Sequence, residues 1–176
     1  NKIKDYKNLN DFYGIETDIR DHNQKIILSH DPFQNGEDFF KFIKYVDKTI
    51  FLNIKSFGLL KKILNYIKKK KIYLLDISFS EFHFLYKHNL SNKILLRFSS
   101  YEKHKLDEKF FKKIEWIWFD YFNGKRIKKK DYLYLKKHKK KICLVSPDLL
   151  GKKGEITSYI KYLNKNKIII DAVCTK

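Results

Sequence analysis

Short apolar runs alternate with longer amphipathic stretches along the chain, and this alternation limits the fold more than any other feature of the sequence. The runs are rich in β-branched and aromatic residues, which is typical of strands. They predict strands over Gly14–Arg20, Lys25–Ser29, Thr49–Ile54, Ile72–Ile77, Lys93–Phe98, Trp116–Asp120, Lys141–Val145 and Ile168–Cys174. The stretches between them predict helices over Gly36–Val46, Leu59–Lys69, Ser80–His88, Leu106–Lys113, Lys128–His138 and Gly154–Asn164. This order indicates an α/β fold with a mostly parallel sheet.

Seven of these strands are principal ones, and Lys25–Ser29 is a short extra strand that forms a hairpin with the strand before it. A closed (β/α)8 barrel has eight strands. We therefore expect a TIM-barrel-like domain without its first strand in this sequence, in which Ile3–Phe12 is the first helix. The alternative is an open doubly wound sheet, but its usual glycine-rich phosphate loop does not occur. No linker or repeat divides the sequence, so we expect one domain over residues 1–176.

The composition limits the class of protein. A chain of 176 residues with fifteen Phe and twelve Tyr can bury a core and is not expected to be disordered. Its net charge of +19 comes almost entirely from Lys, which recurs where the ends of helices are predicted. We interpret these lysines as solvated helix ends and expect no specific nucleic-acid partner, although a basic nucleic-acid-binding domain remains an alternative. Attraction to anionic substrates or membrane surfaces also remains open.

The cysteines and the chain start bear on the cellular compartment. Cys143 and Cys174 lie in apolar runs without CxxC spacing, so we expect buried free thiols. No apolar stretch approaches the roughly 20 residues of a membrane span, and the start does not resemble a signal peptide. A cytoplasmic protein is therefore expected. Because the sequence opens on Asn1 and contains no Met, we interpret its start as processed or truncated.

Polar residues stand at the end of nearly every predicted strand. Burying such groups without partners costs a few kcal/mol each, so their convergence on one polar pocket is the simplest explanation. In α/β barrels the functional groups gather at the carboxyl ends of the strands. On this basis we expect four of these residues to bind substrate: Arg20, Arg97, Asp120 and Ser146.

The segment Gly14-Ile-Glu-Thr-Asp-Ile-Arg20 is followed nine residues later by Ser29-His-Asp-Pro-Phe33. In a strand, Glu16 and Asp18 project from the same face because side chains alternate with a period of two. His30 follows the next apolar run, and an imidazole can transfer a proton near neutral pH. Two carboxylates beside an imidazole suit a phosphodiester site that depends on a divalent metal.

These motifs resemble the E-x-D and H-D segments of the glycerophosphodiester phosphodiesterase superfamily, which includes phosphatidylinositol-specific phospholipase C-like enzymes. In that superfamily the second barrel strand carries E-x-D and a small hairpin ends in H-D. Phe51-Leu-Asn-Ile-Lys55 resembles the next strand, and Asp171-Ala-Val-Cys-Thr-Lys176 resembles the closing strand. The resemblance extends over essentially the whole chain, but only the E-x-D and H-D part is specific.

The resemblance implies a function and a set of roles. Glu16 and Asp18 would bind a divalent cation, Mg²⁺ or Ca²⁺, with Asn53 as a third ligand. His30 would act as general acid or base, and Lys55 would stabilise charge on the phosphoryl group. The expected activity is metal-dependent cleavage of a glycerol- or polyol-phosphodiester, or of a phosphate-linked polymer, by hydrolysis or by attack of a neighbouring hydroxyl.

Two departures from the superfamily pattern matter. Its first strand carries a His-Arg pair whose histidine is the other catalytic imidazole, and this sequence has no such pair. Either that strand precedes Asn1, or the protein lacks it and is catalytically impaired. The second departure is Asn53, which stands where the superfamily has an acidic residue, and a neutral amide should weaken cation affinity. A catalytically impaired barrel that binds a phosphorylated ligand is therefore the main alternative function.

Each motif also has a purely structural interpretation. Glu16 and Asp18 would then form the exposed face of an edge strand, and His30 would belong to a turn with the Asp-Pro pair that follows it. Arg97 would simply pair with a nearby carboxylate, and Lys55 would be one more surface lysine.

Overall fold

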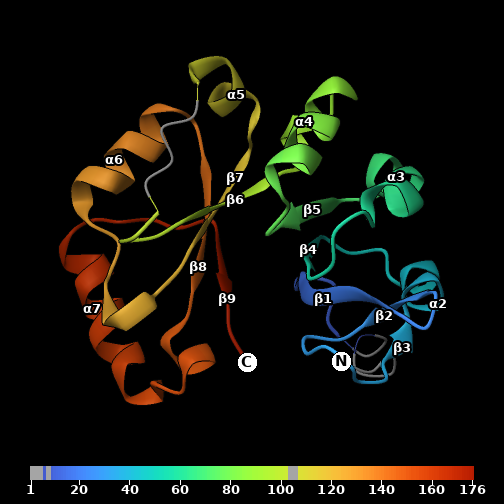
Figure 1. The fold of residues 1–176 in the computed structure, drawn as a ribbon. Helices are drawn as coiled ribbons and strands as arrows, with labels where there is room; N and C mark the ends of the chain where they lie inside the picture. Colours follow the sequence, from blue (N-terminus) through green and yellow to red (C-terminus); the bar gives the residue numbers. More distant parts are fainter. Residues whose placement is uncertain (1–5, 7–8, 103–106) are drawn as a thin grey trace. The chain divides into compact units, whose positions relative to one another are not determined.

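The computed structural model describes residues 6, 9–102 and 107–176, which form two compact units, each with its own β-sheet (Figure 1). The first unit ends at Ile94, and the second begins at Leu95. The strands of the first unit are β1 (Ile15–His22), β2 (Lys25–Leu28), β3 (Glu37–Asp38), β4 (Ile50–Ile54) and β5 (Ile72–Leu75). Its helices are α2 (Phe39–Tyr45), α3 (Leu60–Lys69) and α4 (Phe79–Lys87), and Ser91–Lys93 forms a 3-10 turn.

The sheet of the first unit has the order β3-β2-β1-β4-β5. β1, β4 and β5 are parallel, whereas β2 and β3 form antiparallel pairs at one edge. The register places Asp18 of β1 beside Asn53 of β4, and Asn53 beside Leu75 of β5. An isolated parallel bridge joins Leu74 of β5 to Ile94.

The two faces of the three parallel strands differ in chemistry because side chains alternate along each strand. On one face every residue of the part that pairs in parallel is buried, and all except Thr17 are aliphatic: Ile15, Thr17, Ile19, Ile50, Leu52, Ile54, Ile72 and Leu74. The opposite face carries Glu16, Asp18 and Asn53 among apolar neighbours. The polar residues of β1 and β4 are therefore brought to a single face.

The second unit is a wholly parallel α/β arrangement with the sheet order β6-β7-β8-β9. Its strands are β6 (Leu95–Phe98), β7 (Trp116–Phe119), β8 (Lys141–Val145) and β9 (Ala172–Cys174). Its helices are α5 (Glu108–Lys113), α6 (Lys129–Lys137) and α7 (Ile156–Lys165). Short 3-10 turns cover Phe122–Gly124, Pro147–Leu150 and Lys153–Glu155.

The core of the second unit lies between one face of its sheet and the helices. Phe98, Ile117 and Ile142 come from successive strands and belong to the same buried cluster as Leu135 of α6 and Leu163 of α7. α6 and α7 lie together on one side of the sheet (Figure 1). Arg97 of β6 projects from the opposite face, because side chains alternate along the strand and Phe98 belongs to the core.

The α/β class predicted from the sequence is confirmed, and most predicted elements agree with the structure to within two residues. The predicted helix over Gly36–Val46 is wrong at its start, because Glu37–Asp38 form β3 and the Asp38 side chain accepts the Lys41 backbone N–H to begin α2. The predicted strand over Ile168–Cys174 is shorter in the structure, where β9 covers only its last residues. Half of the predicted helix over Ile3–Phe12 lies outside the described residues, and residues 9–12 form a bend and a turn instead of a helix. Leu106, the first residue of another predicted helix, also lies outside the described residues.

The described residues show two sheets and no closed (β/α)8 barrel, so the barrel remains a hypothesis. The single domain over residues 1–176 likewise stays a prediction. None of the helices in the described ranges has the length and apolar character needed to cross a membrane.

Lys140 is a buried cation that closes the end of a helix. Its Nζ donates a hydrogen bond to the carbonyl oxygen of Phe111 and, over 2.6 Å, to that of Ile114, at the C-terminal end of α5. These carbonyls have no further helical turn to supply donors. Burial lowers the pKa of the Lys140 ammonium, so its carbonyl partners offset a real desolvation penalty.

We expect Lys140→Met to lower the free energy of unfolding by about 2 kcal/mol, because the Ile114 carbonyl loses the Lys140 donor and the Phe111 carbonyl keeps only the Ile114 backbone N–H, while the apolar contacts remain. Urea unfolding followed by circular dichroism measures the change. Lys137→Met, at an exposed position of α6, is the matched control and should be close to neutral. Equal stability of the two variants would contradict the role given to Lys140.

Candidate functional site

A polar cluster occupies one face of the first sheet, where the first half of β1 lies beside β4 and its carboxyl end. Glu16 and Asp18 are two residues apart on β1, and Asp18 lies directly beside Asn53 in the parallel register. Lys55 follows β4 immediately, and its backbone N–H donates to the carbonyl of Ile19 over 2.9 Å. The sequence predicted a shared face for Glu16 and Asp18, and the structure brings Asn53 and Lys55 from the neighbouring strand and its end to the same cluster.

Asp18 forms an ion pair inside this cluster. Its Oδ1 lies 3.3 Å from the Nζ of Lys55, and the Asp18 residue is only 7% exposed. The Oδ1 atoms of Asp18 and Asn53 are buried, and neither accepts a hydrogen bond from any described residue. Buried oxygens without hydrogen-bond donors are costly unless another group satisfies them. Their hard, oxygen-only chemistry suits Mg²⁺ or Ca²⁺.

Glu16 is a strongly perturbed acid. Burial, and secondarily the charge of Asp18, raise its pKa from 4.5 to about 7, against the opposing effects of Lys55 and His30. Asp76, which follows β5, adds a smaller contribution in the raising direction. A carboxyl with a pKa near neutrality in a polar cluster is typical of functional sites, because burying such a group lowers the stability of the fold.

His30 lies after β2, where the hairpin returns alongside β1. The preceding backbone N–H, that of Ser29, donates to the carbonyl of Asp18 over 3.2 Å, which fixes the chain beside the carboxylates. The His30 side chain is 67% exposed, and its Nδ1 lies 2.7 Å from Oδ1 of Asp31. Because a carboxylate only accepts hydrogen bonds, Nδ1 carries the proton and Nε2 remains to give or take one. His30 and Asp31 thus have the arrangement of an oriented acid or base.

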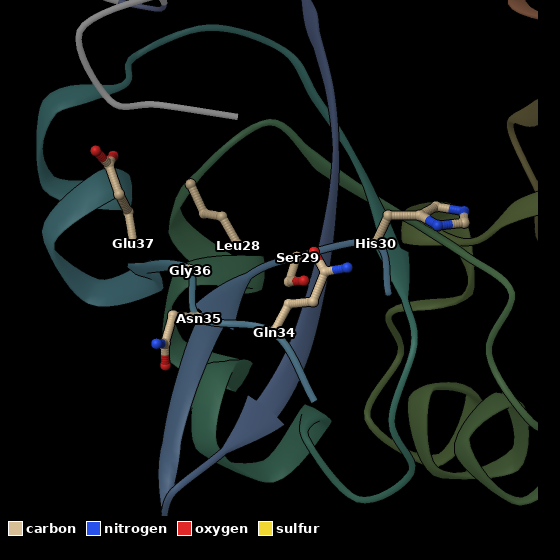
Figure 2. A pocket seen from close by; sticks show the side chains of 7 residues that line it. All are labelled: Leu28, Ser29, His30, Gln34, Asn35, Gly36 and Glu37. Atoms are coloured by element: carbon tan, nitrogen blue, oxygen red, sulfur yellow. The ribbon is translucent and has the colours of Figure 1, made fainter. Parts of the chain in front are cut away.

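A pocket of about 460 Å³ lies over the loop between β2 and β3. It is lined by Leu28, Ser29, His30, Gln34, Asn35, Gly36 and Glu37. Figure 2 shows the imidazole of His30 pointing away from the side chains of Asn35 and Glu37. Gly36 is needed here, because a Cβ at this position would lie 2.2 Å from the Leu28 carbonyl oxygen. The lining includes neither Glu16 nor Asp18. His30 is the one residue that both lines this pocket and belongs to the predicted catalytic set.

Arg20 is the third residue of the β1 alternation, after Glu16 and Asp18. Its Nε is buried and makes no hydrogen bond to any described residue. A guanidinium N–H in this state can donate to a bound anion. The predicted role of Arg20 in substrate binding is compatible with this position but remains a prediction.

The second unit carries the other predicted substrate-binding residues. Arg97 of β6 donates through a guanidinium N–H to Oδ2 of Asp120, which directly follows β7. The guanidinium also lies over the ring of Phe122, 5.8 Å from its centroid. Asp120 is buried, so the pair neutralises a carboxylate that would otherwise be costly. The structural interpretation of Arg97, pairing with a carboxylate, is therefore confirmed, and binding of substrate by Arg97 and Asp120 stays a prediction.

Ser146, the last predicted substrate-binding residue, belongs to a cluster around Asp148. The Oδ2 atom of Asp148 accepts hydrogen bonds from Thr175 Oγ1 and the Lys176 backbone N–H, each over 2.9 Å. The Ser146 hydroxyl, above all, lowers the pKa of Asp148 to about 2, so this buried carboxyl is ionised at neutral pH. Asp148 was not among the predicted site residues. Its position just past the end of β8 was the signal that could have identified it.

The first unit carries the side chains best suited to bind a metal ion, but only two of them are carboxylates. No group of three or more His, Cys, Asp or Glu side chains that could hold a metal is found in the described ranges. The cluster on β1 and β4 has two carboxylates and reaches three oxygen donors only through the Asn53 amide. A third acidic residue, Asp76, influences Glu16 electrostatically and was also missing from the predicted site.

Comparison of the chain with protein-family models, with curated proteins and with solved structures finds no match in any of the three. The case for a function therefore depends on the arrangement of the side chains described above. The strongest candidate for a catalytic or binding site is the polar cluster on the first sheet. It consists of Glu16, Asp18, Asn53 and Lys55, with His30 beside it.

Glu16 should make the protein less stable as the pH rises from about 4.5 to about 7. In this window the folded protein holds a proton on Glu16 that the unfolded chain has lost, so the free energy of unfolding falls with pH. We expect Glu16→Gln to raise the free energy of unfolding by about 2 kcal/mol at pH 8 and to flatten this slope. Urea unfolding at several pH values measures both effects.

The matched control for this prediction is Glu108→Gln, which changes an exposed glutamate whose pKa is lowered rather than raised. It should leave the slope between pH 4.5 and 7 in place. An unchanged slope in Glu16→Gln would show that the pKa of Glu16 is not raised.

Proposed function

We propose that this protein is a metal-dependent phosphodiesterase that acts on a glycerol- or polyol-phosphodiester, as its resemblance to the glycerophosphodiester phosphodiesterase superfamily implies. One observation carries the proposal. Two carboxylates, an amide and a lysine lie together on one face of the sheet, and two of their buried oxygens accept no hydrogen bond from the described residues. A site of this composition fits a divalent cation together with an anionic phosphodiester.

The proposal includes the (β/α)8 barrel that the resemblance implies. The order of the strands supports it, because β1, β4 and β5 neighbour one another in chain order, as do β6 to β9. The strand order of the first sheet does reverse at β1, as in a doubly wound sheet, but β2 and β3 on the reversed side pair antiparallel, whereas the strands of a doubly wound sheet are mostly parallel. The remaining strand of the barrel would be the one that carries the superfamily's His-Arg pair.

Glu16, Asp18 and Asn53 are the residues that would hold the cation, which when bound supplies positive charge to the non-bridging phosphoryl oxygens. The ion pair with Asp18 keeps the Lys55 ammonium on the same face of the sheet. Lys55 can therefore stabilise the charge that develops on the phosphoryl oxygens as the nucleophile adds. Binding a cation would also favour the ionised form of Glu16, whose burial and proximity to Asp18 disfavour that form.

His30 is assigned the proton transfer to the leaving oxygen. A water molecule or a neighbouring substrate hydroxyl forms the new P–O bond and releases its proton to the solvent. The bond to the leaving alcohol breaks, and Nε2 of a protonated His30 gives that alcohol its proton. Asp31 orients the ring through Nδ1. The exposure of His30 leaves Nε2 accessible to a substrate.

A second candidate function is a barrel that binds a phosphorylated ligand without cleaving it. Asn53 favours this function, because its neutral amide supplies less charge to a cation than the superfamily's acidic residue. Lys55 and Arg20 would then act only as anion-binding groups.

We expect the protein to hydrolyse bis(p-nitrophenyl) phosphate or glycerophosphodiesters with Mg²⁺ or Ca²⁺ and to lose this activity in EDTA. Asp18→Asn and His30→Ala should each lower kcat/KM about 100-fold or more, since one removes a ligand charge and the other a proton donor. Release of p-nitrophenol and of free alcohol measures the rates.

Matched controls lie close by on the same hairpin. Asp21→Asn changes an exposed carboxylate of β1, and His22→Ala changes the neighbouring histidine, and both should keep most of the activity. Activity that survives EDTA, Asp18→Asn and His30→Ala would rule out the proposed mechanism. Ligand-dependent stabilisation without turnover would instead support the binding function.

Asn53→Asp should convert the cluster into a tighter cation site. A third carboxylate beside Asp18 adds repulsion, so the thermal midpoint should fall in EDTA, and Mg²⁺ or Ca²⁺ should then raise it more than in the parent protein. We expect about a tenfold gain in cation affinity, measured by thermal unfolding and by calorimetric titration. Asn65→Asp, at an exposed position of α3, is the control and should not change the affinity. Equal affinity in the parent and Asn53→Asp would exclude Asn53 from the site.

A further inference from the structure

Two phenylalanine side chains project from neighbouring loops of the first unit. Phe57 follows β4 and is 74% exposed, and Phe79 is the first residue of α4 and is 79% exposed. A single exposed aromatic residue is ordinary on a protein surface. These two differ because the structure holds their loops together around one apolar pocket.

Glu81 joins the two loops. Its carboxylate is buried, with Oε1 accepting the Gly58 backbone N–H and Oε2 accepting the Ser78 backbone N–H, each over 3.1 Å. Ser78 in turn accepts the Glu81 backbone N–H, which completes a capping box at the start of α4. Gly58 has a φ of 85°, a left-handed conformation that favours glycine. The loops that carry Phe57 and Phe79 are thus fixed relative to each other.

A pocket of about 410 Å³ lies between these loops. It is lined by Phe57, Gly58, Leu60, Lys61, Ser80, Glu81 and Phe84. The oxygens of Glu81 are engaged by the loop backbone, so much of the free lining is hydrocarbon. Phe79 stacks on Phe82 with their ring centroids 6.1 Å apart, which supports its ring at the surface.

Two lysines follow the Phe57 loop: Lys61 lines the pocket, and the charge of Lys62 also acts on the exposed Asp21 carboxylate. Lys61 and Lys62 are exposed in the first turn of α3, directly after the Phe57 loop. Between Ile54 and Lys93 the sequence has many lysines and only two acidic residues, Asp76 and Glu81, of which Glu81 is buried. The surface therefore combines aromatic rings with a local excess of positive charge, and the net charge of the whole chain has the same sign.

We propose that Phe57, Phe79, Lys61 and Lys62 form a docking surface for an anionic lipid bilayer. The rings enter the boundary between headgroups and acyl chains, and the lysines contact the anionic headgroups. The hydrocarbon lining of the pocket favours a bilayer over a nucleic acid, whose phosphates need polar partners along a groove. This inference does not depend on the phosphodiesterase activity.

Co-sedimentation of the full chain with vesicles tests the proposal. Binding is expected to vesicles that contain phosphatidylglycerol, to weaken on vesicles of phosphatidylcholine alone, and to fall as salt is added. Phe57→Ser with Phe79→Ser should lower the partition coefficient about tenfold, as should Lys61→Glu with Lys62→Glu. Because these positions are exposed, circular dichroism should show an unchanged fold in each double variant.

Matched controls test whether binding depends on this surface or on any exposed aromatic ring and any exposed lysine. Phe33→Ser removes a ring that is 93% exposed in another loop, and Lys137→Glu with Lys139→Glu reverses exposed charges in the second unit. Both should bind vesicles nearly as well as the parent protein. The proposal is overturned if controls and surface variants bind equally, or if vesicles are not bound while DNA is retained through the same four residues.

Discussion

The parallel pairing of β1 with β4 is the interaction on which the candidate site depends. It places Asp18 beside Asn53 and, one step further, lets Lys55 reach the Asp18 carboxylate. The same pairing directs the aliphatic residues of both strands to the opposite, fully buried face. A shift of one residue in the register would exchange the two faces and expose that apolar layer. Burial of the apolar face thus determines the position of the polar one.

The polar face holds two acids, one buried and one half-buried, and Lys55 compensates only part of their negative charge. Glu16 and Asp18 are two acids on one strand, and burial adds to their mutual repulsion, so the pKa of Glu16 rises to about 7. Lys55 offsets the charge of Asp18 but leaves buried oxygens of Asp18 and Asn53 without a hydrogen bond from the described residues. A bound cation would relieve both problems, which is the physical basis of the proposed metal site.

The candidate site and the proposed docking surface share one loop. Lys55 and Phe57 are two residues apart after β4, and Glu81 ties this loop to the start of α4. The second unit stabilises its buried charges differently, since Arg97 neutralises Asp120, and Oδ2 of Asp148 accepts two hydrogen bonds. Oδ1 of Asp148 is buried and accepts no hydrogen bond from the described residues, so this unit also keeps an unsatisfied oxygen. The first unit differs because its unsatisfied oxygens belong to two neighbouring strands and lie beside a lysine.

The sequence by itself determined the order of strands and helices and the shared face of Glu16 and Asp18, because periodicity is a local property that burial reinforces. It also predicted β8 at the bounds observed for it, Lys141–Val145. Helix starts were less certain: we predicted α4 to begin at Ser80, but Ser78 caps it, because Glu81 returns a hydrogen bond to the Ser78 backbone. Only the tertiary structure decided the pairing of Arg97 with Asp120, the raised pKa of Glu16 and the cluster at Asp148. These features depend on register and burial, which bring together residues far apart in the chain and which no local pattern specifies.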